Sequence, residues 1–193
     1  MERCLSSVPV DRHRSRRSLP NVIPLEESRS TLVMNYDAQP DALDCDLVYK
    51  FFWQFSVFEC ALKREGFLKN RKDGSALPDW DKFAKEISGG FDGALPRDFQ
   101  QAILVLTTAT PRKQVVVNDR LAWQDNKRGD GETFEAFVLR MVRTVRNNLF
   151  HGGKYPDGPV EEVARDRDLL RAGCRVLEEC VKLHKGLARW VQT

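Results

Sequence analysis

The sequence predicts an all-α protein, a bundle of four or five helices preceded by a disordered N-terminal tail. Two observations carry this prediction. Apolar side chains recur at intervals of three and four residues, the helical period, in several separate stretches of the chain. Glycine and proline stand at the ends of these stretches, where helices begin and end. A chain of 193 residues is long enough for one domain with a buried core.

Residues 1–40 are expected to form the disordered tail. They contain four prolines, many serines and no sustained apolar period. The basic run over residues 12–17 is either part of a solvated tail or a nucleic-acid-binding arm or localisation signal. Residues 41–193 are expected to form the helical domain.

Two helices are predicted in the first half of this domain. One spans about Leu43 to Leu68, where aromatic and aliphatic residues recur with helical spacing, and Gly66 is expected to fray its end. A polar turn follows over residues 69–76. The second helix is short, over residues 78–87, with proline and acids in its first turn and Gly89-Gly90 after it.

A third helix is predicted from Pro96 to Thr107, and Pro111 excludes its continuation. The β-branched run over residues 114–118 predicts a short strand or an extended loop. A polar, glycine-containing loop over residues 125–131 follows. This middle part of the chain is the one segment where extended structure competes with helix.

A fourth helix is predicted from about Glu132 to Leu149, and a last long one from residue 160 to about Trp190. The fourth has a continuous apolar stripe and a polar face. The stripe consists of Phe134, Phe137, Val138, Met141, Val145 and Leu149, and the polar face of Arg140, Arg143, Arg146 and Asn147. Gly152-Gly153 follows, and glycine readily adopts the left-handed conformation found at many helix ends.

Several classes of protein are excluded by composition. The formal net charge is only +3, so any contact with nucleic acid would come from a local site. The five cysteines show no CxxC spacing, and no carboxylate cluster or phosphate-binding glycine loop occurs, so no metal and no cofactor is expected. No apolar run approaches membrane-spanning length, and no secretory signal is recognisable, so a cytoplasmic protein without a membrane segment is expected.

The candidate site residues stand at the end of the fourth predicted helix. Arg146 and His151 are five residues apart. Arginine can hold a phosphate through paired hydrogen bonds, and histidine can move protons near neutral pH. In an unbroken helix, five residues correspond to a rotation of about 140°. We therefore expect His151 at or just past the last turn, where its imidazole can turn back toward Arg146.

Residues 146–154, Arg-Asn-Asn-Leu-Phe-His-Gly-Gly-Lys, resemble the Arg-polar-x-x-x-His motif of the HEPN superfamily. The aromatic stretch around residues 55–63 and the long helix after the motif are similar to that family too. The resemblance covers roughly residues 43–190. It implies an RNA-cleaving or RNA-binding helical domain, usually a homodimer in which two arginines and two histidines share one cleft. Many such proteins are toxins or antiviral defence effectors, and others have lost catalysis.

These observations lead to the hypothesis of a dimeric, metal-independent endoribonuclease. The ribose 2′-OH would attack the adjacent phosphorus, with His151 moving the proton and Arg146 holding the phosphate. Asn147 would orient either group or contact the RNA backbone. Arg143 and Lys154 would add contacts to phosphate. One motif supplies one histidine, so a two-fold interface would supply both an acid and a base.

Two alternatives remain open. In the first, the domain is a non-catalytic module that binds RNA or a protein partner such as an antitoxin, and Arg146 and His151 hold the helix end and the dimer interface together. In the second, it is an enzyme that acts on a nucleotide. Structural roles are expected for Arg140 (solvated or in an intrahelical ion pair) and for His184 (core or interface). Glu59 is expected to pair with Lys63, one turn later.

Overall fold

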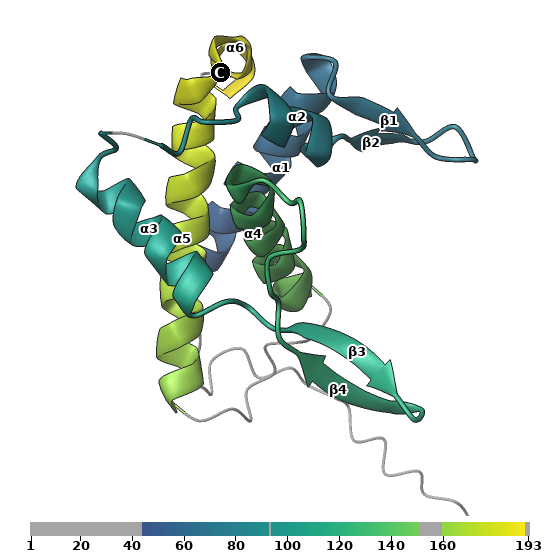
Figure 1. The fold of residues 1–193 in the computed structure, drawn as a ribbon, viewed down its shortest axis with the longest axis vertical. Helices are drawn as coiled ribbons and strands as arrows, with labels where there is room; N and C mark the ends of the chain where they lie inside the picture. The colour runs from purple at the N-terminus through teal and green to yellow at the C-terminus, as the bar shows by residue number, and fades with distance from the viewer. Residues whose placement is uncertain (1–43, 93, 151–159, 192–193) are drawn as a thin grey trace, which may run out of the picture. The chain divides into compact units, whose positions relative to one another are not determined.

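Six helices and two β-hairpins make up the part of the chain that the computed structural model describes, residues 44–92, 94–150 and 160–191 (Figure 1). The predicted tail and the segment between the last two predicted helices lie outside the described residues. The two longest helices, α1 (Cys45–Arg64) and α5 (Val160–Leu183), pack against each other, and α3 (Arg97–Thr108) packs against α5. The expectation of a predominantly helical domain is confirmed.

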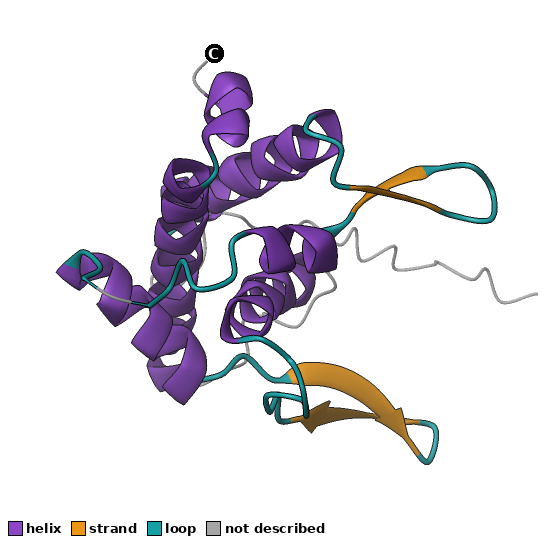
Figure 2. Ribbon diagram, turned by 45° about the horizontal axis from the view of Figure 1, so that its top comes forward, coloured by secondary structure: helices purple, strands orange, loops and turns teal. Residues whose placement is uncertain are grey.

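The expectation of an all-α fold is wrong, because two antiparallel hairpins extend away from the helices (Figure 2). Strands β1 (Leu68–Asn70) and β2 (Ala76–Pro78) occupy the region predicted as a polar turn. Strands β3 (Lys113–Val117) and β4 (Arg120–Gln124) pair where the sequence predicted one strand or an extended loop. Each of these short strands thus pairs with the strand next to it in the sequence.

The turns explain why these hairpins close. Asn118 and Asp119 form the two-residue connection of the second hairpin, and both have positive φ angles, 49° and 58°. Such angles match the twist of the flanking strands, and Asn and Asp tolerate them better than most residues. In the first hairpin, Gly74 takes a φ of 81°, and Asp73 accepts hydrogen bonds from the backbone and hydroxyl of Ser75. Local turn chemistry therefore sets both registers.

Helix α1 begins and ends as its sequence dictates. The Asp44 carboxylate accepts hydrogen bonds from the backbone N–H groups of Asp46 and Leu47, which caps the helix. After Arg64 the chain turns at Gly66, which has a φ of 83°. In between, the predicted apolar face is buried, including Phe51, Phe55, Phe58 and Leu62. The predicted first helix is confirmed, with shorter bounds.

The next helices follow the predictions closely, and the last one does not. Helix α2 (Trp80–Glu86) is capped by Asp79, and α4 (Phe134–Phe150) carries the predicted motif arginine. The last predicted helix is divided, since α5 ends at Leu183 and α6 (Lys185–Val191) begins after His184. At this break the Leu187 N–H donates to the carbonyl of His184, three residues earlier, as in a tight helical turn. The His184 imidazole packs edge-on against the Phe67 ring. His184 is half-buried, as a core-edge histidine.

An aromatic cluster forms the centre of the core. Trp80 of α2 stacks on Phe58 and contacts Phe55, with ring centroids 5.2 and 5.4 Å apart. Phe83 packs edge-on against Phe58 and Phe67. Aromatic pairs of this kind contribute beyond the area they bury. The cluster fixes α2 across α1, and α4 packs against α2, α3 and α5.

Helix α4 is buried on more than the predicted stripe. Phe137, Val138, Met141 and Val145 are buried as expected, and so are Leu139 and Val142, which lie outside the stripe. Neighbours on several sides of α4 account for this. None of the helices in the described part of the chain combines the length and apolarity that a bilayer crossing requires.

The packing of α1 on α5 yields a stability prediction. A Cβ added to Gly173 of α5 would lie 2.7 Å from Cε2 of Phe51, whose side chain is fully buried. Overpacking costs about 1–3 kcal/mol, and alanine gains about 1 kcal/mol over glycine in a helix. We therefore expect Gly173→Ala to lower the free energy of unfolding by about 1 kcal/mol in urea denaturation. With Phe51→Leu in the same chain, the added cost of Gly173→Ala should shrink. A stabilising Gly173→Ala would show that the two helices do not approach so closely.

Candidate functional site

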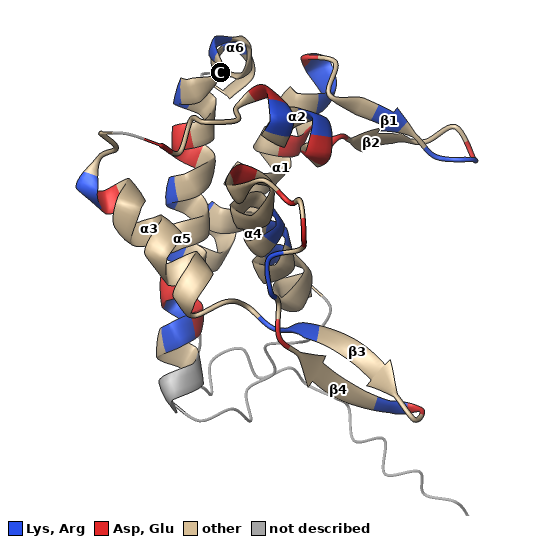
Figure 3. Cartoon of the chain, in the orientation of Figure 1, with Lys and Arg blue, Asp and Glu red and all other residues tan. Residues whose placement is uncertain are grey.

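Three of the five predicted site residues lie on α4, within the described residues: Arg143, Arg146 and Asn147. His151 and Lys154 lie outside them, so the distance between Arg146 and His151 stays a prediction. Figure 3 shows basic positions along α4 and at the start of β3. The geometry of the candidate site is therefore built from the last two turns of α4 and their neighbours.

Two aromatic rings hold the Arg146 side chain. Its guanidinium carbon lies 4.7 Å from the centroid of the Phe150 ring and 5.6 Å from that of Phe55. A guanidinium over an aromatic face is attracted to the ring quadrupole, more strongly where water is partly excluded. Arg146 is half-buried, and its Nη1 donates a hydrogen bond to Oδ1 of Asn147 at 3.2 Å. The structure thus brings Arg146 and Asn147 together.

The charge of Arg146 has no carboxylate partner among the described residues; its contacts there are the two rings and Asn147. A guanidinium has five N–H donors, and one hydrogen bond uses only one of them. Asn147 is itself exposed. Within the described part of the chain, the end of α4 therefore presents a fixed cation with donors left for an anionic ligand.

Arg143 lies one turn earlier, with its guanidinium carbon 5.8 Å from the Trp80 ring centroid. The Trp80 indole in turn donates to Oε1 of Glu59 at 3.2 Å. The ion pair expected between Glu59 and Lys63 is not formed in the described structure, and Glu59 binds the indole instead. Arg143 and Arg146 thus follow the same pattern, each held over a ring that belongs to the core cluster.

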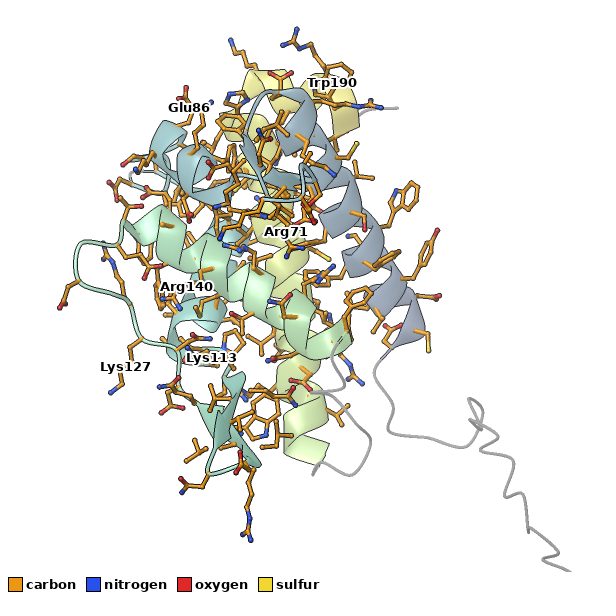
Figure 4. All side chains as sticks on the ribbon, turned by 90° about the vertical axis from the view of Figure 1, so that its right-hand side faces the viewer. Arg71, Glu86, Lys113, Lys127, Arg140 and Trp190 are labelled. Atoms are coloured by element: carbon orange, nitrogen blue, oxygen red, sulfur yellow. The ribbon has the colours of Figure 1, made fainter. Side chains whose placement is uncertain are left out.

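Arg140 has a different role from the one the sequence predicted. Its Nε and Nη2 donate to the two carboxylate oxygens of Glu132 at 2.7 and 2.8 Å, and Nη1 donates to Oδ1 of Asn126 at 3.0 Å. Nη2 also donates to the Lys127 carbonyl. Glu132 precedes α4, so this pair is not intrahelical. Figure 4 shows Arg140 on the side of α4 that faces the loop of Lys127. Arg140 therefore organises the loop before α4.

The Arg140 guanidinium also determines the protonation of its partner. Its hydrogen bonds lower the pKa of Glu132 below the usual value, against the opposing effect of partial burial. The pKa of Arg140 is raised by the same hydrogen bonds. The pair is charged at neutral pH.

Asn148 was not predicted as a functional or structural residue, and it is buried. Its Nδ2 donates to the Arg112 carbonyl at 2.7 Å, which ties the base of the β3–β4 hairpin to the end of α4. The signal was present, because Asn148 continues the apolar stripe through Met141 and Val145 at helical spacing. A polar residue in such a stripe usually has a buried hydrogen-bond partner.

An exposed apolar surface lies beside Arg146. Tyr49, Phe52 and Trp53 share one face of α1, and their side chains are 65%, 40% and 58% exposed. The Phe52 ring centroid lies 5.4 Å from that of Phe150, which is 47% exposed and carries the Arg146 guanidinium on its face. We call Tyr49, Phe52, Trp53 and Phe150 the α1 aromatic surface.

Metal-binding clusters are missing from the described part of the chain, and two of its cysteines are poor nucleophiles. No group of three or more His, Cys, Asp or Glu side chains there is placed to hold a metal ion. Cys174 and Cys180 are buried, and burial raises the pKa of the Cys174 thiol to about 11 and that of Cys180 further. A thiol with a raised pKa is a poor nucleophile at neutral pH. Cys45 and Cys60 are exposed, and the candidate site is built on the arginines of α4, which the motif predicts.

Comparison of the chain with protein-family models, with curated proteins and with solved structures gave no match in any of the three. The candidate site therefore depends on its own geometry and on the resemblance of the motif.

Glu132→Gln tests the role assigned to Arg140. Replacing the carboxylate weakens two charge-assisted hydrogen bonds, and we expect a loss of about 1–3 kcal/mol in the free energy of unfolding at pH 7. The pKa of Glu132 is lower in the folded protein than its value of 4.5 in the unfolded chain. The ionised carboxylate therefore stabilises the fold above pH 4.5, and this stabilisation is lost as the pH falls through the folded-state pKa. Urea denaturation of wild type and of Glu132→Gln, from pH 7 downward, should show the difference in their free energies of unfolding shrinking below pH 4.5.

Asp168→Asn is the matched control, because the Asp168–Arg171 pair is exposed, with N and O 3.7 Å apart. Exposed pairs of this kind contribute little. A similar loss in both variants would contradict the special role of Glu132.

Proposed function

We propose that this protein is a metal-independent endoribonuclease in which Arg146 holds the scissile phosphate and His151 moves the proton. The observation that supports the proposal is the presentation of Arg146, with its guanidinium held between Phe55 and Phe150 and no carboxylate partner among the described residues. A guanidinium prepared in this way loses little entropy on binding a phosphate, since its rotamer is already set.

The proposed reaction uses the substrate's own hydroxyl. The ribose 2′-OH attacks the adjacent phosphorus, the bond to the 5′-oxygen breaks, and a 2′,3′-cyclic phosphate forms. One proton leaves the 2′-OH and one reaches the departing oxygen. A histidine with a pKa near 6.5 can serve either step, an effect of about 10²–10⁴-fold. Arg146 stabilises the negative charge that develops on the phosphoryl oxygens.

The neighbouring groups have supporting roles in this proposal. Asn147 accepts a hydrogen bond from Nη1 of Arg146 and so orients the guanidinium. Arg143, three residues earlier, adds a second cation that contacts the RNA strand, and Lys154 adds positive charge after the motif. Together they extend the contact from one phosphate to its neighbours.

A second copy of this chain is the proposed occupant of the α1 aromatic surface. Exposed apolar patches of this kind usually mark interaction sites. This one is continuous with Arg146 through Phe150, and each chain supplies only one motif histidine. A two-fold pairing there would bring two motifs together and provide both the acid and the base.

A non-catalytic RNA-binding module is the second candidate, and the same surface favours it. Exposed aromatic rings beside an arginine can stack unpaired bases while the guanidinium holds the backbone. In either case RNA is the proposed ligand, in the cytoplasm. A toxin or antiviral effector, with an antitoxin or another protein as its regulator, is the role that such a cleaving activity would serve.

Arg146→Ala and His151→Ala test the catalytic proposal. Labelled single-stranded RNA is incubated with each protein in EDTA, and the ends of the products are analysed. We expect wild type to cleave and leave 2′,3′-cyclic phosphate ends, and each variant to lose at least about 10²-fold in rate. Arg146→Lys should fall between, because lysine keeps the charge without the paired donors.

Arg171→Ala, an exposed arginine on α5, is the control and should cleave as wild type does. Equal cleavage by all variants, or complete loss of wild-type cleavage in EDTA, would refute the proposal. Binding of RNA by wild type without cleavage would support the non-catalytic module.

Trp53→Glu tests the dimer. A carboxylate in the middle of the α1 aromatic surface should dissociate the pair and abolish cleavage, while the exposed position leaves monomer stability almost unchanged. Light scattering measures the mass, and thermal unfolding checks the fold. Leu104→Glu, at a 50% exposed apolar position on α3, is the control and should remain dimeric. A wild-type protein that cleaves RNA as a strict monomer would contradict the shared site.

A further inference from the structure

A hollow of about 740 Å³, wide open to solvent, lies where the end of α3, the base of the β3–β4 hairpin, α4 and α5 meet. Arg146 is not among its lining residues, so the hollow is separate from the candidate site. Its volume is within the range of small-molecule sites. The buried Phe137 of α4 is the one aromatic residue that lines it.

The charges of the hollow are mostly positive. Four cationic side chains line it and come from three segments: Arg112 before β3, Lys127 and Arg128 after β4, and Arg165 on α5. Asp125 is the one lining carboxylate. Convergence of cations from separate segments favours an anionic ligand, and guanidinium groups suit phosphate oxygens in particular.

Hydrogen bonds to backbone carbonyls and from Arg140 hold the lining residues of the hollow in place. Asn126 is 7% exposed, donates to the Pro111 carbonyl at 2.7 Å and accepts from Arg140. Arg140 also fixes the Lys127 carbonyl. Nη2 of Arg165 donates to the carbonyls of Ala109 and Thr110 at the end of α3, which fixes its position. Within the described part of the chain, the other donors of this guanidinium stay available. A wall formed before binding lowers the entropic cost of binding.

Two threonine hydroxyls at the hollow narrow the class of ligand. Thr107 donates its proton to the Ile103 carbonyl at 2.8 Å, and Thr108 donates to the Leu104 carbonyl at 2.7 Å. Both hydroxyl oxygens can then only accept a further hydrogen bond. A sugar hydroxyl or a base amino group can donate to them, whereas the phosphate group of a nucleotide, as a dianion, cannot. A nucleotide can therefore use the cations and the threonine oxygens at the same time, through different parts of the molecule.

We propose that this hollow binds a nucleotide, with its phosphate on Lys127, Arg128 and Arg165 and its hydroxyl or amino donors on Thr107 and Thr108. The nucleotide is either free or part of an RNA strand, since both present the same chemistry. The proposal goes beyond RNA cleavage at Arg146 and does not depend on it.

Binding is measured with two probes, AMP by calorimetry and a short labelled single-stranded RNA by fluorescence polarisation. We expect wild type to bind AMP more tightly than inorganic phosphate. Lys127→Gln with Arg128→Gln should weaken binding by about tenfold or more. For RNA the double variant should also reduce the slope of log K against log salt by about 0.7 for each phosphate that the removed cations neutralised. Lys85→Gln, at an exposed lysine of α2, is the control and should bind as wild type does.

Substitution of the exposed Lys127 side chain leaves its carbonyl, and so the bond from Arg140, in place. Lys127→Glu alone is the second variant in case the double variant unfolds, with thermal unfolding as the check. Weakened binding of AMP alone assigns a free nucleotide, of RNA alone a strand, and of both a site that accepts either. Absence of AMP and RNA binding, or unchanged binding in the charge variants, would overturn the proposal. AMP binding is measured without cleavage, so it can fail or succeed independently of the nuclease activity.

Discussion

The enclosure of α4 is the constraint on which the rest of the structure depends. A helix buried on several sides must find a partner for each polar group that points inward, because an unpaired buried polar group is costly. Glu135, 3% exposed, accepts from the Gly89 N–H, and Asn148 donates to the Arg112 carbonyl. Arg140 binds the loop before the helix. Each partner lies in a loop or at the base of a hairpin, so burial of α4 also fixes its surroundings.

One strip of α4, which carries Arg143 and Arg146, is not fully buried by these neighbours. Arg143 and Arg146 lie where the aromatic core reaches the surface, and their guanidinium groups lie over the rings of Trp80, Phe55 and Phe150. Among the described residues, rings and not carboxylates contact these two charges, which preserves the positive potential near the helix end there. The C-terminus of a helix carries a partial negative charge, and the arginines offset it. The proposed phosphate contact thus depends on the aromatic rings at the edge of the core, which hold the arginine side chains.

Much of the helical fold could be predicted from periodicity, and the departures have local causes. The β3–β4 hairpin was missed because its turn, Asn118-Asp119, lacks the glycine that usually marks such a connection. The break before α6 was missed because His184 continues the apolar spacing, whereas its ring packs sideways on Phe67. For the site, periodicity placed Arg146 on the polar face but could not show that rings would hold it. The roles of Arg140 and Asn148 depend on contacts with distant segments, which spacing alone does not reveal.

Side-chain NMR of the arginines tests most directly whether Arg146 is a phosphate-binding group. A 2′-O-methyl RNA oligonucleotide, which cannot be cleaved by 2′-OH attack, is added to the protein, and the Nε–H signals are assigned by single substitutions. We expect a large shift of the Arg146 signal, a smaller one for Arg143, and none for Arg171 on α5. RNA binding that leaves the Arg146 signal unchanged would contradict the role of Arg146 as the phosphate-binding group.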